Sequence, residues 1–174
     1  RTLVTVHCGN FNGSRLVDVR PQEGLAGRKV GRLTFDVDVS ADGATLVFAE
    51  GSFSGASVPD EADLHIASWS GDRFKRDPAR DRLLARVNTP ELEYAPALSS
   101  DGLELYFTRM SGFWIFRSAH ILVARRAGVD QAFGEPVELK QIDGFVEGPT
   151  LAPDGSLVFH KRVNDRYELW RWVK

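Results

Sequence analysis

The stretch YAPALSSDGLELYFTR, from Tyr94 to Arg109, contains two apolar runs with an Asp-Gly pair between them. Such a pair between alternating apolar segments is a strong signal for a β-hairpin, because Gly accepts the positive φ that tight turns require. Similar stretches occur on either side of it, FDVDVSADGATLVFAEG around Asp42 and EGPTLAPDGSLVFHKR around Asp154. The sequence therefore predicts one hairpin repeated three times.

Further strand-like segments follow each hairpin. Third strands are predicted at ADLHIASW, AHILVARRA and YELWRWVK, and fourth strands at RLLARVNTP and EPVELKQI, with SGDRFKRDPARD as a polar link before the first of these. The N-terminal stretch RTLVTVHCGNFNGSRLVDVRP reads as a second strand, a turn and a third strand. Because no segment shows sustained helical periodicity, we expect an all-β fold.

The spacing of the hairpins favours β-propeller blades. Asp42, Asp101 and Asp154 are 59 and 53 residues apart, slightly more than the ~40–50 residues of one four-stranded blade. The phrases resemble the TolB-type, WD-like repeat of bacterial β-propellers, in which a Pro and then Ser-Pro-Asp-Gly precede an apolar strand. PTLAPDGSLVF is the best copy, whereas VDVSADGATLVF departs from the pattern at Val37 and Ala41.

This resemblance covers nearly the whole chain and implies its architecture. It implies one domain, 1–174, of about three and a half four-stranded antiparallel blades, at 1–33 (partial), 34–92, 93–145 and 146–174. It also favours a periplasmic or other extracytoplasmic location. It implies no particular activity, because the repeat is a scaffold in many unrelated proteins.

So few blades do not close a ring around a central channel. We predict a half propeller, completed by a second copy of the chain or by an absent segment. A five-bladed monomer of shorter, irregular blades is the alternative. Because the chain starts at Arg1 without an initiator Met, we also expect it to be processed or cut from something longer. A structural piece of a larger extracytoplasmic protein is therefore a further hypothesis.

Composition and charge exclude several classes of function. The 174 residues are 43% hydrophobic and 26% charged, as in ordinary folded domains. The net charge of −2 provides no basic field for nucleic acid or anionic lipid, and no apolar run is long enough for a membrane-spanning helix, so neither partner is expected. A single cysteine, Cys8, and isolated histidines give no metal-ligand spacing, so we expect no metal and no other cofactor.

Acidic residues near the predicted channel mouth are the first candidate site. The first strand of each blade lines the channel, and near its mouth the sequence places Asp36, Asp38, Glu93, Tyr94 and Glu147. We expect Asp36 and Asp38 to share a face, because alternate residues of a strand do. Such carboxylates can hold a cation, bind a basic peptide or act as an acid/base pair. The alternative is a solvated mouth whose carboxylates are satisfied by backbone N–H groups and Arg.

Two long loops between second and third strands are the second candidate site. They carry Phe53 in GSFSGASVPDEAD, and Phe113, Trp114 and Phe116 in RMSGFWIFRSAH. Aromatic side chains at the blade ends can stack on a protein partner or a sugar. Alternatively, they cover the edge of their own blade or fill an interface between chains.

These candidates give two hypotheses about function. The leading one is a non-catalytic module that binds a protein, a small molecule or a carbohydrate, with no catalytic residue. The alternative is a propeller-type glycosidase or lyase that uses the carboxylates at the channel mouth. It requires two of them within roughly 5–10 Å of each other, and carboxylates that are each paired to Arg argue against it.

Overall fold

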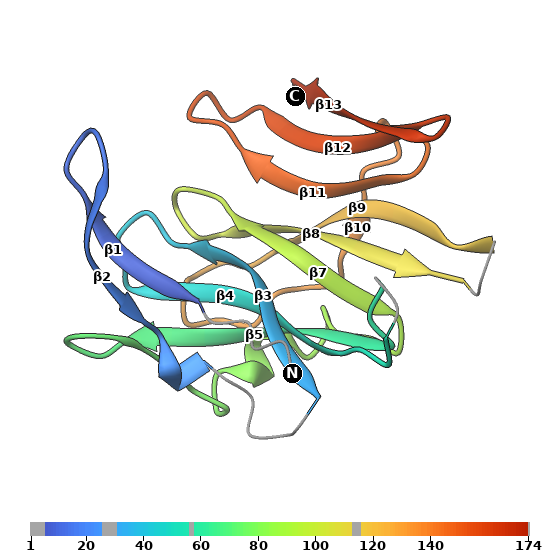
Figure 1. Cartoon of the computed structure of the whole chain (residues 1–174). Coiled ribbons are helices and arrows are strands. Elements are labelled where there is room, and N and C mark those ends of the chain that lie inside the picture. Colours follow the sequence, from blue (N-terminus) through green and yellow to red (C-terminus); the bar gives the residue numbers. More distant parts are fainter. Residues whose placement is uncertain (1–5, 26–30, 56–57, 113–115, 174) are drawn as a thin grey trace.

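The structure, a computed structural model, describes residues 6–25, 31–55, 58–112 and 116–173 (Figure 1). Its strands form four antiparallel sheets that follow one another in chain order, and we call them blades 1 to 4. Two short 3-10 helices, η1 (Glu23–Leu25) and η2 (Asp81–Leu84), complete the regular structure of the described residues. No described helix is long and apolar enough to cross a membrane.

Each blade is a meander in which neighbouring strands pair in sequence order. The strands of blades 1 and 2 are β1 (His7–Phe11), β2 (Leu16–Pro21), β3 (Arg32–Val39), β4 (Thr45–Ser52), β5 (Glu61–Trp69) and β6 (Phe74–Arg76), with blade 2 starting at β3. The strands of blade 3 are β7 (Leu92–Leu98), β8 (Glu104–Ser111), β9 (Ser118–Arg125) and β10 (Val137–Glu138). The strands of blade 4 are β11 (Val146–Leu151), β12 (Leu157–Val163) and β13 (Arg166–Trp172). The repeated hairpins and their third strands thus lie where the sequence predicts them.

The Asp-Gly turns connect the first and second strands of blades 2 to 4. In the first of them, Asp42 Oδ1 accepts hydrogen bonds from the Ala44 N–H (2.9 Å) and the Ser40 hydroxyl (2.6 Å), and Gly43 has a φ of 71°. Asp101 accepts equivalent bonds from Ser99 and Leu103, and Asp154 accepts both of its bonds from the N–H and hydroxyl of Ser156. The three repeated acids are therefore structural residues of turns.

The blades are held together by a repeated Leu-x-Phe motif on the second strand. Both motif residues are buried against the preceding blade, and in blades 2 and 3 the residue between them is buried against the next blade. The motif residues are Leu46, Phe48, Leu105, Phe107, Leu157 and Phe159. Burying one such side chain contributes roughly 1.5–3 kcal/mol to stability. The motif residues therefore supply a large share of the free energy that holds the blades together.

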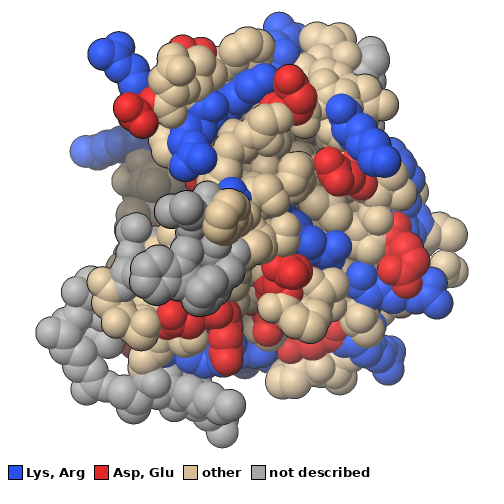
Figure 2. Space-filling view, turned by 90° about the vertical axis from the view of Figure 1, so that its right-hand side faces the viewer, with Lys and Arg blue, Asp and Glu red and all other residues tan. Residues whose placement is uncertain are grey.

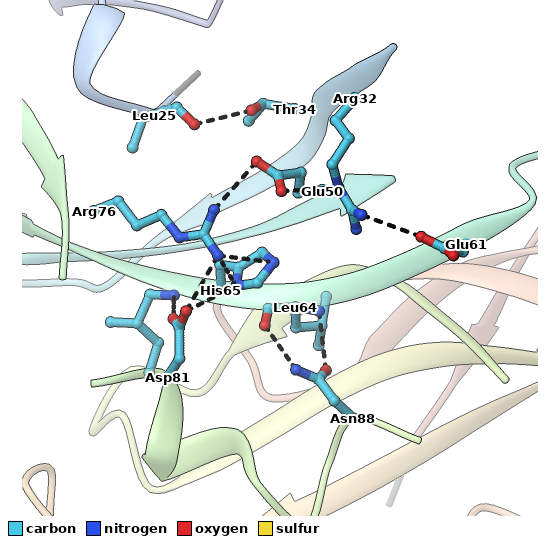
Figure 3. Close-up of polar contacts among 11 residues, drawn as sticks. Leu25, Arg32, Thr34, Glu50, Glu61, Leu64, His65, Arg76, Asp81 and Asn88 are labelled. Carbon is cyan, nitrogen blue, oxygen red and sulfur yellow. Dashed lines mark hydrogen bonds and ion pairs between the residues drawn. The ribbon is translucent and has the colours of Figure 1, made fainter. Parts of the chain in front are cut away.

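The predicted fourth strand RLLARVNTP is wrong. The fourth strand of blade 2 is β6, within the segment expected to be a link, and the predicted stretch starts within η2 and continues as a turn. Its apolar side chains, Leu83, Leu84 and Val87, fill the core between blades 2 and 3. The Asn88 side chain bonds both the N–H and the C=O of Leu64 at 2.9 Å, so it satisfies the edge of β5 in place of a strand (Figure 3).

A β-bulge recurs on the first strand of blades 2, 3 and 4. The residue six positions before each turn Asp has a positive φ: 46° at Asp36, 50° at Ala95 and 67° at Gly148. The pairing register shifts at each of these points. A bulged residue has no cross-strand partner, so the alternation of faces stops there. Asp38 consequently shares its face with Phe35 and not, as predicted, with Asp36.

The two end blades differ from the internal ones. Blade 4 has three described strands where blades 2 and 3 have four, and β13 pairs only with β12 among the described strands. Large exposed apolar side chains lie on both end blades: Phe11, Leu16 and Val19 on blade 1, and Tyr167, Leu169 and Trp170 on blade 4. Charges of both signs are interspersed over the face shown in Figure 2.

Candidate functional site

Residues of blades 2, 3 and 4 line a pocket of about 560 Å³, which we call the central pocket. Four of the predicted site residues meet there: Asp36, Tyr94 and Glu147 from the first strands, and Phe53 from the loop after β4. The other lining residues are Phe35, Val58, Pro59, Met110, Arg117, Phe145, Arg162 and Tyr167. The residue just before the bulge, Phe35, Tyr94 or Glu147, lines the pocket in every repeat.

Two carboxylates face this pocket. Asp36 occupies the bulge of β3; it reaches solvent, but the surrounding walls exclude enough water that burial raises its pKa, offset in part by a hydrogen bond from the Ala95 backbone. Burial also raises the pKa of Glu147; the charge of His160 lowers it and that of Asp36 raises it. Each carboxylate thus affects the other, and both are poorly solvated when charged.

Two tyrosines lie beside Glu147. The Tyr167 hydroxyl donates a hydrogen bond to the Glu147 carboxylate. The Tyr94 hydroxyl is buried and interacts with the Glu147 carboxylate, although no hydrogen bond to it among the described residues has good geometry. Burial and then the nearby charge of Glu147 raise the pKa of Tyr94 well above its usual value. Tyr94 is therefore a neutral hydroxyl group within the pocket wall.

The rest of the pocket wall is aromatic, with two arginines. Phe35 and Phe53 meet edge to face, with 5.5 Å between ring centroids. The Arg162 guanidinium lies over the ring of Phe145, 4.3 Å from its centroid. Apolar walls with a few convergent polar groups are typical of small-molecule sites.

Asp38 and Glu93 do not lie in the central pocket. Asp38 faces a separate depression, and its Oδ2 accepts the Leu98 N–H at 2.7 Å, which links blade 2 to blade 3. Glu93 is fully buried instead of being at a channel mouth. It pairs with Arg109 (Nε to Oε1, 2.7 Å) and accepts two hydrogen bonds from Thr89. Both carboxylates therefore hold the fold together.

The second aromatic loop places no described aromatic residue in the central pocket. Phe116 is 81% exposed and is not among the residues that line the central pocket. Phe113 and Trp114, also predicted as binding residues, lie outside the described residues.

A second cluster of charged residues lies at blade 2 (Figure 3). Glu50 is held between Arg32 (3.1 Å) and Arg76 (3.2 Å), and Arg76 also reaches Asp81 at 3.2 Å. Asp81 lies 3.1 Å from His65 Nδ1. Every charged group here has a partner within the cluster, which is typical of a structural network. In the described ranges no three His, Cys, Asp or Glu residues come together in a way that could hold a metal ion.

Three polar residues of the pocket were not predicted from the sequence: Arg117, Arg162 and Tyr167. A signal for Arg162 was present, because it occupies the same place after the Leu-x-Phe motif as Met110, which also lines the pocket. No such frame pointed to Tyr167 on β13, which comes close to Glu147 only through the pairing of three strands.

Comparison with solved structures identifies the fold, whereas comparison of sequences finds no relative. No model of a known protein family and no curated protein matches the chain. A solved luciferin-regenerating enzyme matches over 95% of this chain and 51% of its own, with a TM-score of 0.58 and 10% identity. A Trypanosoma rangeli sialidase in complex with the inhibitor DANA matches over 90% and 29%, with a TM-score of 0.41 and 14% identity. The chain thus spans about half the length of the first protein, and together with the four stacked sheets this shows an all-β, partial β-propeller.

Proposed function

We propose that the chain is a non-catalytic binding module of the TolB-type propeller class, and that a small organic ligand binds in the central pocket. One observation carries the proposal: three blades direct aromatic and ionisable side chains from equivalent repeat positions into one cavity. A volume of about 560 Å³ lies within the ~300–1,000 Å³ range of small-molecule sites. The buried hydroxyl of Tyr94, beside Glu147, adds a polar group that a ligand can contact.

Saturation-transfer NMR tests this proposal with four probes of different chemistry: methyl α-D-glucopyranoside, L-phenylalanine, phenethylamine and 3-phenylpropionate. We expect at least one of them to bind, and its signal to be lost in Phe53→Ala. Trp69→Ala is the matched control, because Trp69 is also a half-exposed aromatic residue of blade 2 but lines a different pocket. If no probe binds, or if only Trp69→Ala abolishes the signal, the proposal fails.

A glycosidase or lyase is the second candidate, favoured by one observation. Asp36 and Glu147 line the same pocket, and burial raises the pKa of both, so either is suited to the role of general acid. Glu93 and Asp38 do not support an enzyme, because Glu93 is paired with Arg109 and Asp38 accepts the Leu98 N–H. Hydrolysis of a 4-nitrophenyl glycoside that disappears in both Asp36→Asn and Glu147→Gln would establish this candidate over the binding module.

A further inference from the structure

We infer that the central pocket binds organic ammonium compounds, in which an amine is attached to an apolar or aromatic body; this rests on the proposed function and specifies its ligand class. The inference combines two carboxylates of the pocket, which form no ion pair with a described Lys or Arg, with its aromatic walls.

The two carboxylates of the pocket form no ion pair with any Lys or Arg that the structure describes, and the residue directly opposite Glu147 on the neighbouring strand is His160. The buried Glu93 is paired with Arg109, and Glu50 with two arginines. By contrast, no described Lys or Arg forms an ion pair with Asp36 or Glu147. Hydrogen bonds from the Ala95 backbone to Asp36 and from Tyr167 to Glu147, with the charge of His160, offset only part of the cost of burial, because the pKa of both carboxyl groups is still raised. A bound cation between β3 and β11 would therefore stabilise both charges at once.

The walls suit a cation that carries apolar groups. Five of the lining residues are aromatic: Phe35, Phe53, Tyr94, Phe145 and Tyr167. Aromatic faces attract ammonium and guanidinium groups through their quadrupole. The wall already displays this chemistry, since Arg162 lies over Phe145. A strongly hydrated metal ion would gain little from such walls, whereas an organic ammonium group would use both the rings and the carboxylates.

The two arginines of the lining, Arg117 and Arg162, do not reverse the preference of the pocket for an ammonium group. The Arg162 side chain lies against Phe145 and acts on Glu147 only from a distance, since the two form no ion pair. Arg117 forms no ion pair or hydrogen bond with other described residues. It offers a place for a carboxylate on the same ligand, so amino acids remain compatible, but the ammonium group makes the essential contact.

Three probes with the same phenyl body test the inference by NMR titration: phenethylamine, its near-isostere 2-phenylethanol and 3-phenylpropionate. We expect phenethylamine to bind at least about tenfold more tightly than either of the others. Glu147→Gln should weaken phenethylamine about tenfold and leave 2-phenylethanol unchanged. Glu91→Gln, at an exposed acid outside the lining, is the matched control and should leave both affinities unchanged. Asp36→Asn repeats the test if Glu147→Gln fails to fold.

The outcomes separate this inference from the proposed function. Equal affinity for amine and alcohol, or tighter binding of 3-phenylpropionate, overturns the ammonium inference, while sensitivity of that binding to Phe53→Ala would leave the pocket as a binding site. Binding of the monosaccharide alone would likewise overturn the ammonium inference and leave the pocket as a binding site. If none of the three phenyl probes binds, the inference is wrong, and the monosaccharide and L-phenylalanine titrations then decide the proposed function.

Discussion

Replacing Glu93 by Leu should destabilise the protein by about 3 kcal/mol, the lower end of the usual cost of breaking a buried ion pair. Glu93 is fully buried and accepts three hydrogen bonds, from the Thr89 N–H (3.0 Å), the Thr89 hydroxyl (2.6 Å) and Arg109 Nε (2.7 Å). The substitution leaves the Arg109 charge without its partner. Because 21% of the Arg109 side chain is exposed, water can solvate part of that charge, which places the expected value at the lower end.

A double-mutant cycle isolates the charge. In Glu93→Leu/Arg109→Met the unpaired cation is gone, and only the Thr89 donors and the Val87 carbonyl lose partners. We expect this variant to cost about 1–2 kcal/mol, less than the single substitution, because unsatisfied neutral groups are less costly than a charge. Urea unfolding followed by Trp fluorescence and circular dichroism gives each free energy, provided that both signals share one transition.

The opposite pattern of results would refute this reasoning. If Glu93→Leu unfolds within about 0.5 kcal/mol of the wild type, as substitutions at the surface usually do, Glu93 is not in a buried pair. If the same variant also loses ligand affinity, Glu93 belongs to an accessible channel mouth, as the sequence alone suggested.

The bulges, the pocket carboxylates and the free edge give three further predictions. Gly148→Ala should cost at least about 1–2 kcal/mol in urea unfolding, because the new Cβ meets His160 at 2.9 Å and φ is positive, whereas Ala95→Gly should relieve strain and be neutral or stabilising. Glu147→Gln should gain stability relative to the wild type as pH rises above about 4.3, the ordinary pKa of Glu. Burial raises the folded pKa of Glu147, so the wild type loses stability as this group ionises and the Gln variant does not; parallel curves would contradict this. We also expect light scattering to show a dimer that forms through blade 4. Leu169→Lys should disrupt it, whereas Val137→Lys, at another exposed apolar residue, should not. A monomeric wild type would contradict the half-propeller dimer.

Much of the fold could be predicted because its strongest signals are local. Asp-Gly followed by an apolar run specifies a turn and the strand after it, so the hairpins lie where the sequence places them. The fourth strand of blade 2 was misassigned because Leu83 and Leu84 have the apolarity of a strand but fill a core from a 3-10 helix. Hydrogen bonds from the Asn88 side chain to the Leu64 backbone take the place of strand pairing there, and no sequence pattern predicts such bonds.

The site was harder to predict because it depends on where the face alternation stops. Alternation placed Asp36 with Asp38, and the bulge separates them. Gly148 at the same repeat position was a hint of positive φ, but Asp36 and Ala95 concealed it, since both are L-residues in a conformation that favours Gly. Glu93 and Tyr94 are neighbours in sequence, yet one pairs inside the fold and the other lines the pocket. Only the packing of three blades distinguishes them.

The recurring bulge has a consequence for how such a protein can change over evolutionary time. The residue before it reaches the central pocket in all three repeats, as Phe35, Tyr94 and Glu147, and the bulged residue itself is free of a cross-strand partner. Stacking of the blades depends chiefly on the Leu-x-Phe motif, and Phe35 and Tyr94 add contacts to the core between blades 2 and 3. If the central pocket binds ligands as proposed, single-codon changes at these positions, one in each repeat, would alter its ligand preference while the Leu-x-Phe motif that stacks the blades stays the same.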